Sequence, residues 1–192
     1  MTGVQTCALP ISRFARAADW FAAEEARRRA EGGRIALTET RGEVEIPAPA
    51  GPFRLHARVD RIDRLPDGRV AIYDYKTGAP PTKKQVRAFA RQLPLTAVIA
   101  AAGGFEDLGP VEAGRLEYVG VTGAGPGGEA RPLDLAELSP AATREELAAL
   151  IAAYDDPATP YPSRLRPAFL SFAGDYDQLA RLGEWSATGE DA

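Results

Sequence analysis

The residues best suited to chemistry lie in one stretch of the chain, residues 53–78, which reads FRLHARVDRIDRLPDGRVAIYDYKTG. The Pro-Asp-Gly run at residues 66–68 predicts a tight turn between two extended segments. If the turn is centred on Asp67, then Asp60 and Asp74 lie equally far from it and directly opposite each other. Opposite residues of an antiparallel pair have Cβ atoms roughly 4.5–5.5 Å apart. The hairpin therefore predicts two neighbouring carboxylates.

Side chains alternate along a strand, so Lys76 shares the face of Asp74, while Tyr75 points the other way. Two carboxylates this close repel each other unless a divalent cation lies between them, and their hard oxygens suit Mg²⁺ or Mn²⁺. A lysine beside such an ion can stabilise charge that builds on a phosphate. Asp63 could compete with Asp60 as a ligand, but alternation favours Asp60. The alternative is a charged hairpin face on which Asp74 and Lys76 simply pair in solvent.

Composition limits the other classes of function. The 192 residues are 45% hydrophobic and 26% charged, which fits one ordinary folded domain. The formal charge of −4 excludes binding to nucleic acid through bulk positive charge, so any such contact must be local. The single cysteine, Cys7, excludes a disulfide framework and an iron–sulfur cluster. With no nucleotide-binding motif, apolar membrane-length run or secretory leader, we expect a cytoplasmic protein without a membrane segment.

The elements that position the hairpin are predicted from periodicity and turn residues. Helices are expected over residues 12–31, 83–102, 140–154 and 175–185, and strands over residues 34–46, 53–65, 69–75 and 116–121. Pro94 either kinks the second helix or starts another, Ser139 caps the third, and residues 123–128 form a flexible glycine-rich loop. The order predicts an α+β fold: an antiparallel three-stranded meander in a mixed sheet flanked by helices.

The first eleven residues, MTGVQTCALPI, differ in composition from the chain that follows. We interpret residues 1–11 as a non-native leader and residues 12–192 as a single domain; the alternative is a genuine, irregular N-terminus. The large aromatic side chains are expected in the core, Tyr118 in preference to a base-stacking surface. They are Trp20, Phe89, Phe105, Tyr118, Phe172 and Trp185.

Three strings taken together, VDRID, DYKTG and the following QLPL, resemble the RecB-like branch of the PD-(D/E)XK nucleases. The resemblance is closest to the C-terminal nuclease domain of the bacterial AddB proteins, on the strength of residues 92–97, 103–105 and 174–186. It implies a restriction-endonuclease-like core and a Mg²⁺-dependent DNA nuclease within a helicase–nuclease complex that repairs double-strand breaks. The implied partners are DNA and an AddA-like subunit.

The same resemblance implies a role for each matching residue. Asp60 and Asp74 match the metal-binding aspartates, Lys76 matches the catalytic lysine, and the backbone carbonyl of Tyr75 matches a further metal ligand. Gln92 matches the supporting glutamine on the next helix. In the family, a metal-activated water attacks the scissile phosphodiester.

Two departures from the family pattern are visible. Where the family carries a tyrosine one helical turn after its glutamine, this chain has Thr96. The family histidine on an upstream helix has no counterpart, and His56, the only histidine, is expected at the surface. Together with the leader, this suggests an N-terminally truncated and weakened nuclease. The alternatives are a non-catalytic DNA-binding or assembly module and a partner-docking domain.

A basic stripe follows the DYKTG string. Lys83, Arg87 and Arg91 fall at i, i+4 and i+8, with Lys84 alongside, so that one helical face could follow a DNA backbone. A solvated helix face is an equally good interpretation.

Overall fold

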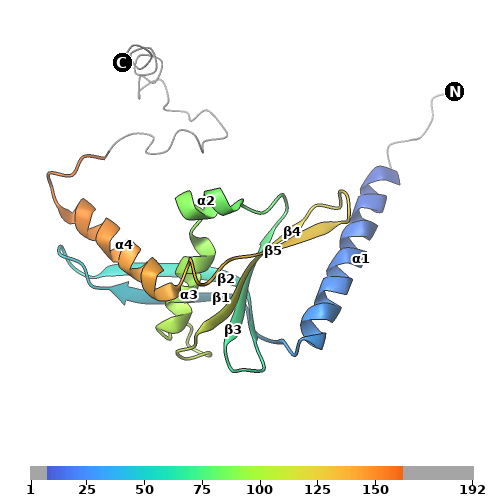
Figure 1. The fold of residues 1–192 in the computed structure, drawn as a ribbon, viewed down its shortest axis with the longest axis horizontal. Coiled ribbons are helices and arrows are strands. Elements are labelled where there is room, and N and C mark those ends of the chain that lie inside the picture. Colours follow the sequence, from blue (N-terminus) through green and yellow to red (C-terminus); the bar gives the residue numbers. More distant parts are fainter. Residues whose placement is uncertain (1–7, 162–192) are drawn as a thin grey trace, which may run out of the picture. The chain divides into compact units, whose positions relative to one another are not determined.

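The computed structural model describes residues 8–161, and the chain divides into two compact units, residues 1–155 and 156–192. All described helices and strands belong to the first unit (Figure 1). They are α1 (Ala8–Ala30), β1 (Arg34–Ile46), β2 (Phe53–Arg64), β3 (Val70–Lys76), α2 (Lys83–Ala88), α3 (Gln92–Ala101), β4 (Ala113–Val121), β5 (Gly128–Pro132) and α4 (Pro140–Asp155). The single domain predicted over residues 12–192 stays a prediction.

The strands form one mixed sheet in the order β1-β2-β3-β4-β5. Strands β3 and β4 run parallel, and every other neighbouring pair is antiparallel. A parallel pair needs a long crossover, and here the crossover is built from α2 and α3. The predicted α+β class and the antiparallel meander are confirmed.

The β2–β3 hairpin has the register that the turn predicts. Arg61 faces Tyr73, and Ile62 faces Ile72. Gly68 takes a φ of 84°, which glycine adopts at no steric cost, and its N–H donates to the carbonyl of Leu65 over 3.0 Å. This short turn fixes the relative position of Asp60 and Asp74 along their strands.

The sheet is covered differently on its two faces. The larger core packs α3 against the strands and includes Ile62, Ile72, Ile99, Phe105 and Leu116, all fully buried. A smaller cluster on the other face contains Ala71, Tyr73 and Val119, with Trp20 of α1 packed on it. Figure 1 shows α1 beside β4 and β5, and α3 together with α4 elsewhere on the sheet. Strands β2 and β3, which carry Asp60 and Asp74, thus belong to a sheet with helices on both of its faces.

The region predicted to be helical over residues 83–102, with Pro94 as a kink or as the start of a second helix, forms two helices. Thr82 caps α2 with a capping box, and the helix ends at Ala88, followed by the C-cap residue Phe89 with an extended φ of −159°. Pro94 lies in the first turn of α3, where a missing N–H costs nothing. Because α2 ends there, Phe89 is 51% exposed, and its predicted place in the core is wrong.

The other aromatic predictions have mixed outcomes. Phe105 and Tyr118 are buried as expected, and Trp20 is half-buried against the smaller cluster. Phe172 and Trp185, like the helix predicted over residues 175–185, lie outside the described residues.

Sequence analysis did not predict strand β5, and it placed the start of the first helix at residue 12 instead of at Ala8. The predicted glycine-rich loop is the turn between β4 and β5, and GEARP, the sequence of β5, has no apolar alternation that would mark a strand. Helix α1 begins at Ala8, inside the predicted leader of residues 1–11. The Ser139 cap is confirmed, since its Oγ accepts from the N–H of Ala142 over 3.2 Å. Within residues 8–161, no helix combines the length and apolar character needed to span a bilayer.

Candidate active site

The site begins where the β2–β3 ladder ends. Arg61 and Tyr73 are its last paired residues, and Asp60 comes next. Here a side chain replaces the backbone as the acceptor between the two strands: the N–H of Tyr75 donates to Asp60 Oδ2 over 2.7 Å. Asp60 is therefore tied to the strand that carries Asp74.

An irregularity in β1 faces this point. Thr38 pairs with Arg61 and Thr40 pairs with Val59, so Glu39 lies opposite Asp60. Glu39 has a φ of 51°, a left-handed conformation that is uncommon for a residue with a side chain. Both Val59 and Ile62 belong to the larger core, so the alternation of side chains is broken between them. The backbone is thus distorted where Asp60 leaves both ladders.

Asp74 and Lys76 form an ion pair at the end of β3. Lys76 Nζ lies 2.7 Å from Asp74 Oδ2 and donates to Gln92 Oε1 of α3 over 3.2 Å. Asp74 is only 3% exposed, whereas the side chain of Lys76 still reaches solvent. The structure thus places Lys76 in contact with both Asp74 and Gln92.

The electrostatics of Asp74 are those of a buried acid beside a second acid. Burial raises the pKa of Asp74, the Lys76 ammonium lowers it, and the negative charge of Asp60 raises it, so that the net shift is upward. A raised pKa means that the ionised carboxylate is held at an energetic disadvantage. A cation placed between Asp60 and Asp74 would remove that disadvantage.

Tyr118 forms the floor of the site, a role that sequence reasoning did not separate from the core. It is the β4 neighbour of Asp74, and Lys76 Nζ lies 5.9 Å from the centre of its ring. Its hydroxyl donates to the carbonyl of Ala90 over 3.0 Å. Burial raises the pKa of Tyr118 to about 12, so the phenol stays neutral.

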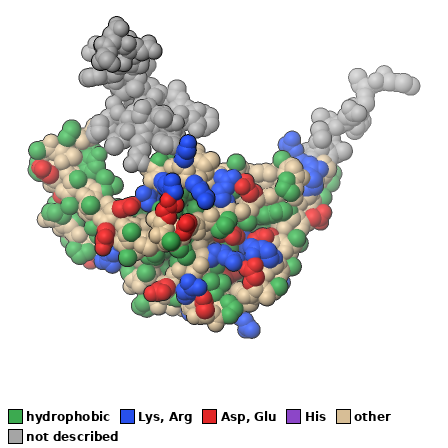
Figure 2. Space-filling model, viewed as in Figure 1, with side chains coloured by type: hydrophobic (Ala, Val, Ile, Leu, Met, Phe, Trp, Pro, Cys, Tyr) green, Lys and Arg blue, Asp and Glu red, His purple; other side chains and the backbone are tan. Residues whose placement is uncertain are grey.

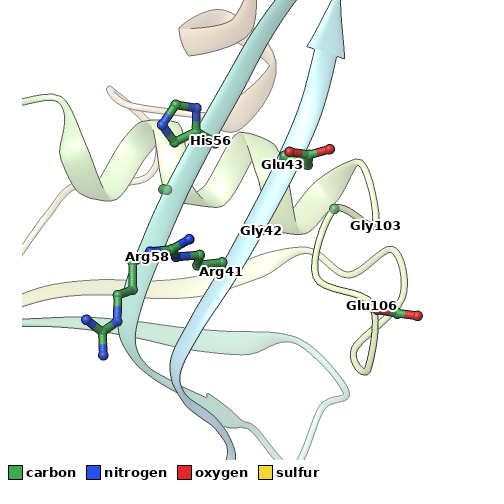
Figure 3. Close-up of a pocket in the computed structure, with 9 residues that line it drawn as sticks. Arg41, Gly42, Glu43, His56, Arg58, Gly103 and Glu106 are labelled. Carbon is green, nitrogen blue, oxygen red and sulfur yellow. The ribbon is translucent and has the colours of Figure 1, made fainter.

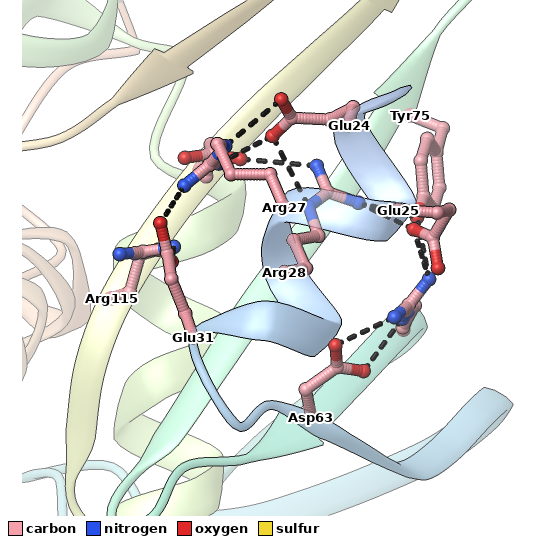
Figure 4. A network of polar contacts seen from close by, with 10 residues as sticks. Glu24, Glu25, Arg27, Arg28, Glu31, Asp63, Tyr75 and Arg115 are labelled. Carbon is pink, nitrogen blue, oxygen red and sulfur yellow. Dashed lines mark hydrogen bonds and ion pairs between the residues drawn. The ribbon is translucent and has the colours of Figure 1, made fainter. Parts of the chain in front are cut away.

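Tyr75 links the site to the opposite face of the sheet. Its hydroxyl accepts from Arg28 over 3.2 Å, and its ring packs against Phe21 with the ring centres 6.0 Å apart. Arg28 and Phe21 both belong to α1, and Figure 4 shows Arg28 and Tyr75 close together. The residue that holds Asp60 through its backbone is therefore anchored by α1 through its side chain.

Arg28 and Arg61 share Glu25 of α1 as a partner and so join a charge network between α1 and the sheet, part of which Figure 4 labels. Arg28 is 1% exposed and pairs with Glu117 of β4 over 3.1 Å. Arg61 pairs with the fully buried Asp63 over 2.6 Å, and with Glu25 of α1 over the same distance. Asp63 thus lies on the α1 side, and its charge is already balanced by that of Arg61.

The predicted basic stripe does not lie on one helical face, because α2 ends at Ala88 and Arg91 precedes α3. Arg87 pairs with Glu137, and Arg91 pairs with Glu146 over 3.0 Å. Lys83 and Lys84, at the start of α2, are exposed. Basic and acidic side chains are interspersed across the face shown in Figure 2, so DNA contacts would have to be local.

The two departures from the family pattern also have structural positions. Thr96 is buried, and its hydroxyl donates to the carbonyl of Gln92 over 2.9 Å, so it stabilises α3 from within. His56 is exposed on β2, in the part of the strand that precedes Asp60 and pairs with β1.

The donor set fits a hard cation that keeps several waters. Asp74 Oδ2 is buried and, among the described residues, accepts no hydrogen bond of good geometry besides its ion pair with Lys76. No group of three or more His, Cys, Asp or Glu side chains within residues 8–161 is placed to hold a metal. Two carboxylates and a backbone carbonyl leave room for water and phosphate oxygens, as Mg²⁺ prefers.

Comparison with known proteins assigns the chain to a family. Residues 8–164 match the family described as the PD-(D/E)XK nuclease superfamily. The solved structure of SSO0001 is similar at 16% sequence identity, with 79% of this chain and 68% of that chain covered and a TM-score of 0.39. Among the curated proteins, none matches the chain. The family match spans the whole mixed sheet and α1 to α4.

Proposed function

The chain belongs to the PD-(D/E)XK nuclease superfamily, and we propose that it is a Mg²⁺-dependent deoxyribonuclease that hydrolyses phosphodiester bonds. Membership indicates a metal-dependent nuclease with the restriction-endonuclease-like core. The observation that carries the proposal is the contact between Lys76 and Asp74, 2.7 Å apart, beside Asp60. Mn²⁺ is expected to replace Mg²⁺, because both take hard oxygen ligands.

In this proposal Asp60, Asp74 and the backbone carbonyl of Tyr75 hold the ion. When bound, Mg²⁺ lowers the pKa of water and neutralises charge on the phosphate. Lys76 reaches solvent beside Asp74, so that its ammonium can stabilise negative charge that develops on the phosphate oxygens. Gln92 holds Nζ of Lys76 through a 3.2 Å hydrogen bond and thereby orients it.

We further propose that the domain serves an AddB-type complex for double-strand break repair, with an AddA-like subunit as partner. The sequence of residues 92–97, which includes Gln92, and the GGF at residues 103–105 support this narrower assignment. The chain has no nucleotide-binding motif, so DNA unwinding would come from another part of such a complex. Lys83, Lys84, Arg87 and Arg91 remain candidates for DNA contacts near the site, with the two lysines the more accessible.

Cleavage of linear DNA in Mg²⁺ tests the proposal directly. The wild type should cleave, Lys76→Ala should bind Mn²⁺ in a calorimetric titration without cleaving, and Asp74→Ala should lose both properties. Asp67→Ala, which removes an exposed turn aspartate, is the matched control and should cleave like the wild type. Equal products from the wild type, Asp74→Ala and Lys76→Ala would overturn the assignment.

The second candidate function is a DNA-binding or assembly module that does not cleave. It is favoured by Thr96, which is buried, bonds to the backbone of its own helix α3 and contributes no group to the site where the resembling family has a tyrosine. It predicts DNA binding that weakens with salt, with no cleavage at any Mg²⁺ or Mn²⁺ concentration.

A further inference from the structure

Tyr75 carries two backbone groups on which the proposed metal site depends. Its N–H donates to Asp60 Oδ2 over 2.7 Å, and its carbonyl is the third proposed metal ligand, beside Asp60 and Asp74. Both groups flank one Cα atom, so a change in the φ or ψ of Tyr75 would alter their directions relative to each other. The contacts that hold Tyr75 in place therefore decide the geometry of the site.

Strand β1 gives Asp60 little support from the other side. Glu39, which lies opposite Asp60, forms an ion pair with Arg58 over 2.8 Å, and both of these side chains are 60% exposed. Exposed ion pairs of this kind are weak. The outer half of the same hairpin opens into a groove of about 850 Å³, lined by side chains of both charges that include Arg41 and Glu43 (Figure 3). Support for Asp60 must therefore come from β3, through Tyr75.

The side chain of Tyr75 is anchored on the α1 face of the sheet. Its hydroxyl accepts from Nη1 of Arg28 over 3.2 Å and from Nη1 of Arg61 over 3.5 Å. Its ring packs against Phe21 of α1, with the ring centres 6.0 Å apart and the planes inclined by 51°. Helix α1 thus contacts Tyr75 through a charged donor and through an aromatic ring.

The two arginines are themselves held firmly. Arg61 donates to both carboxylate oxygens of Asp63 over 2.6 Å each, and Glu25 pairs with Arg61 over 2.6 Å and with Arg28 over 3.1 Å. Both guanidinium groups are buried, with Arg28 only 1% and Arg61 only 7% exposed. Each arginine keeps a carboxylate partner without the Tyr75 hydroxyl, so the charge balance of the network does not require that hydroxyl.

We propose that the Tyr75 hydroxyl, held by Arg28 and Arg61, is a positioning group that couples α1 to Asp60 and so sets the affinity of the site for its divalent cation. The hydroxyl acts through the Tyr75 backbone and touches neither substrate nor metal. Ligands that are fixed before the ion arrives bind it more tightly than ligands that must first be ordered. The consequence for catalysis rests on the proposed nuclease function, whereas the coupling between α1 and Asp60 exists in the metal-free protein.

The sequence offers a matched pair of variants. Tyr75→Phe removes the hydroxyl and keeps the ring that packs on Phe21. Tyr73→Phe removes the same atom two positions earlier on β3, from the same face of the sheet. Arg28 contacts the ring of Tyr73, with its guanidinium carbon 4.0 Å from the ring centre. Tyr73→Phe is therefore the control, because it alters the same network without altering the residue bonded to Asp60.

The first test needs neither metal nor cleavage. Amide hydrogen exchange at residue 75 is measured by NMR and compared with the other β3 amides, so that a general loss of stability is recognised. Exchange at residue 75 should be about tenfold faster in Tyr75→Phe than in the wild type, and within about twofold of the wild type in Tyr73→Phe. Wild-type protection of this amide in Tyr75→Phe overturns the proposal.

The second test changes the α1 side of the contact. Phe21→Ala removes the ring that packs on Tyr75 and should raise the dissociation constant for Mn²⁺, measured by calorimetry, about three- to fivefold. Phe14→Ala shortens an exposed phenylalanine of the same helix and should leave that constant within about twofold. Equal Mn²⁺ affinities of the two variants would mean that α1 does not support the site, and would overturn the proposal.

The third test separates this proposal from the nuclease assignment. In Tyr75→Phe the dissociation constant for Mn²⁺, and the Mg²⁺ concentration for half-maximal DNA cleavage, should both rise about fivefold, while KM for DNA is unchanged and excess Mg²⁺ restores kcat. A merely structural role would lower cleavage at every Mg²⁺ concentration. Wild-type metal affinity in Tyr75→Phe, with normal cleavage, overturns the positioning role alone. No wild-type cleavage, with Mn²⁺ affinity still dependent on the hydroxyl, overturns the nuclease function and supports the positioning role.

Discussion

The backbone N–H of Tyr75 donates a 2.7 Å hydrogen bond to Oδ2 of Asp60, so one proposed metal ligand is held by the strand that carries the other. Asp60→Asn keeps an oxygen acceptor for this bond but removes the charge. We expect it to abolish Mn²⁺ binding in a calorimetric titration while changing the free energy of unfolding by less than about 1 kcal/mol.

Asp60→Ala removes the acceptor as well as the charge. It should also lose metal binding and, in addition, destabilise the fold by about 1–3 kcal/mol, because the Tyr75 N–H is left without its partner. Urea denaturation of both variants makes the comparison. Equal stability of Asp60→Asn and Asp60→Ala would show that the hydrogen bond does not hold the site together.

Asp74 should lower the stability of the metal-free protein at neutral pH. Burial raises its pKa, so the ionised form is favoured less in the folded state than in the unfolded chain. This destabilisation of the folded state is present at pH values above the ordinary pKa of aspartate. It disappears as the pH falls, because the carboxyl is then protonated in both the folded and the unfolded state. Asp74→Asn should therefore raise the free energy of unfolding at pH 7, by roughly 1 kcal/mol.

Two further measurements check the cause of this gain. The difference between Asp74→Asn and the wild type should shrink as the pH is lowered to about 3, below the ordinary aspartate pKa. Mg²⁺ at about 100 times its dissociation constant should stabilise the wild type by about 2.7 kcal/mol and leave Asp74→Asn unchanged. A variant less stable than the wild type at pH 7 would contradict the electrostatic argument.

Gln92 should affect the rate through Lys76 and leave metal binding alone. Its side chain accepts from Lys76 Nζ, and Gln92→Ala leaves the ammonium held by Asp74 only. We expect kcat to fall about tenfold, or about 1.4 kcal/mol of activation free energy, with Mn²⁺ affinity unchanged. Gln85→Ala, which disturbs the cap of α2, is the control and should leave kcat within about twofold.

The buried pair of Arg28 and Glu117 should be intolerant of one-sided change. Arg28→Met leaves the Glu117 carboxylate buried without its partner, which should cost about 3–5 kcal/mol of unfolding free energy. The neighbouring Arg27, whose own side chain is 41% exposed, provides the control, and Arg27→Met should cost less than about 1 kcal/mol. Similar losses in the two variants would mean that the burial of Arg28 has no energetic consequence.

Much of the site geometry could be predicted because it depends on a short turn. Gly68 and its neighbours allow few hairpin registers, and the register in turn puts Asp60 near Asp74. The same symmetric counting across the loop of residues 47–52 would have paired Arg41 with Arg58, which is the register that the structure shows.

Other features depend on contacts that no local pattern reveals. Arg28 and Glu117 are 89 positions apart and meet only because α1 covers β4. The end of α2 at Ala88 separates Arg91 from Arg87, and this break is what removes the predicted basic stripe. Helical periodicity alone could not distinguish one helix from two, because Pro94 is compatible with either arrangement.

The parallel pairing of β3 with β4 has a consequence for how the protein matures. The β2–β3 hairpin closes over a short turn, whereas Lys76 meets Gly120 only after the whole α2–α3 crossover is in place. Contacts distant in sequence form more slowly than local ones. A nascent chain should therefore bring Asp60 and Asp74 together while the ribosome is still completing β4. During that interval the two acids would be adjacent without the tyrosine floor beneath them, and magnesium in the cell could ease their repulsion before synthesis ends.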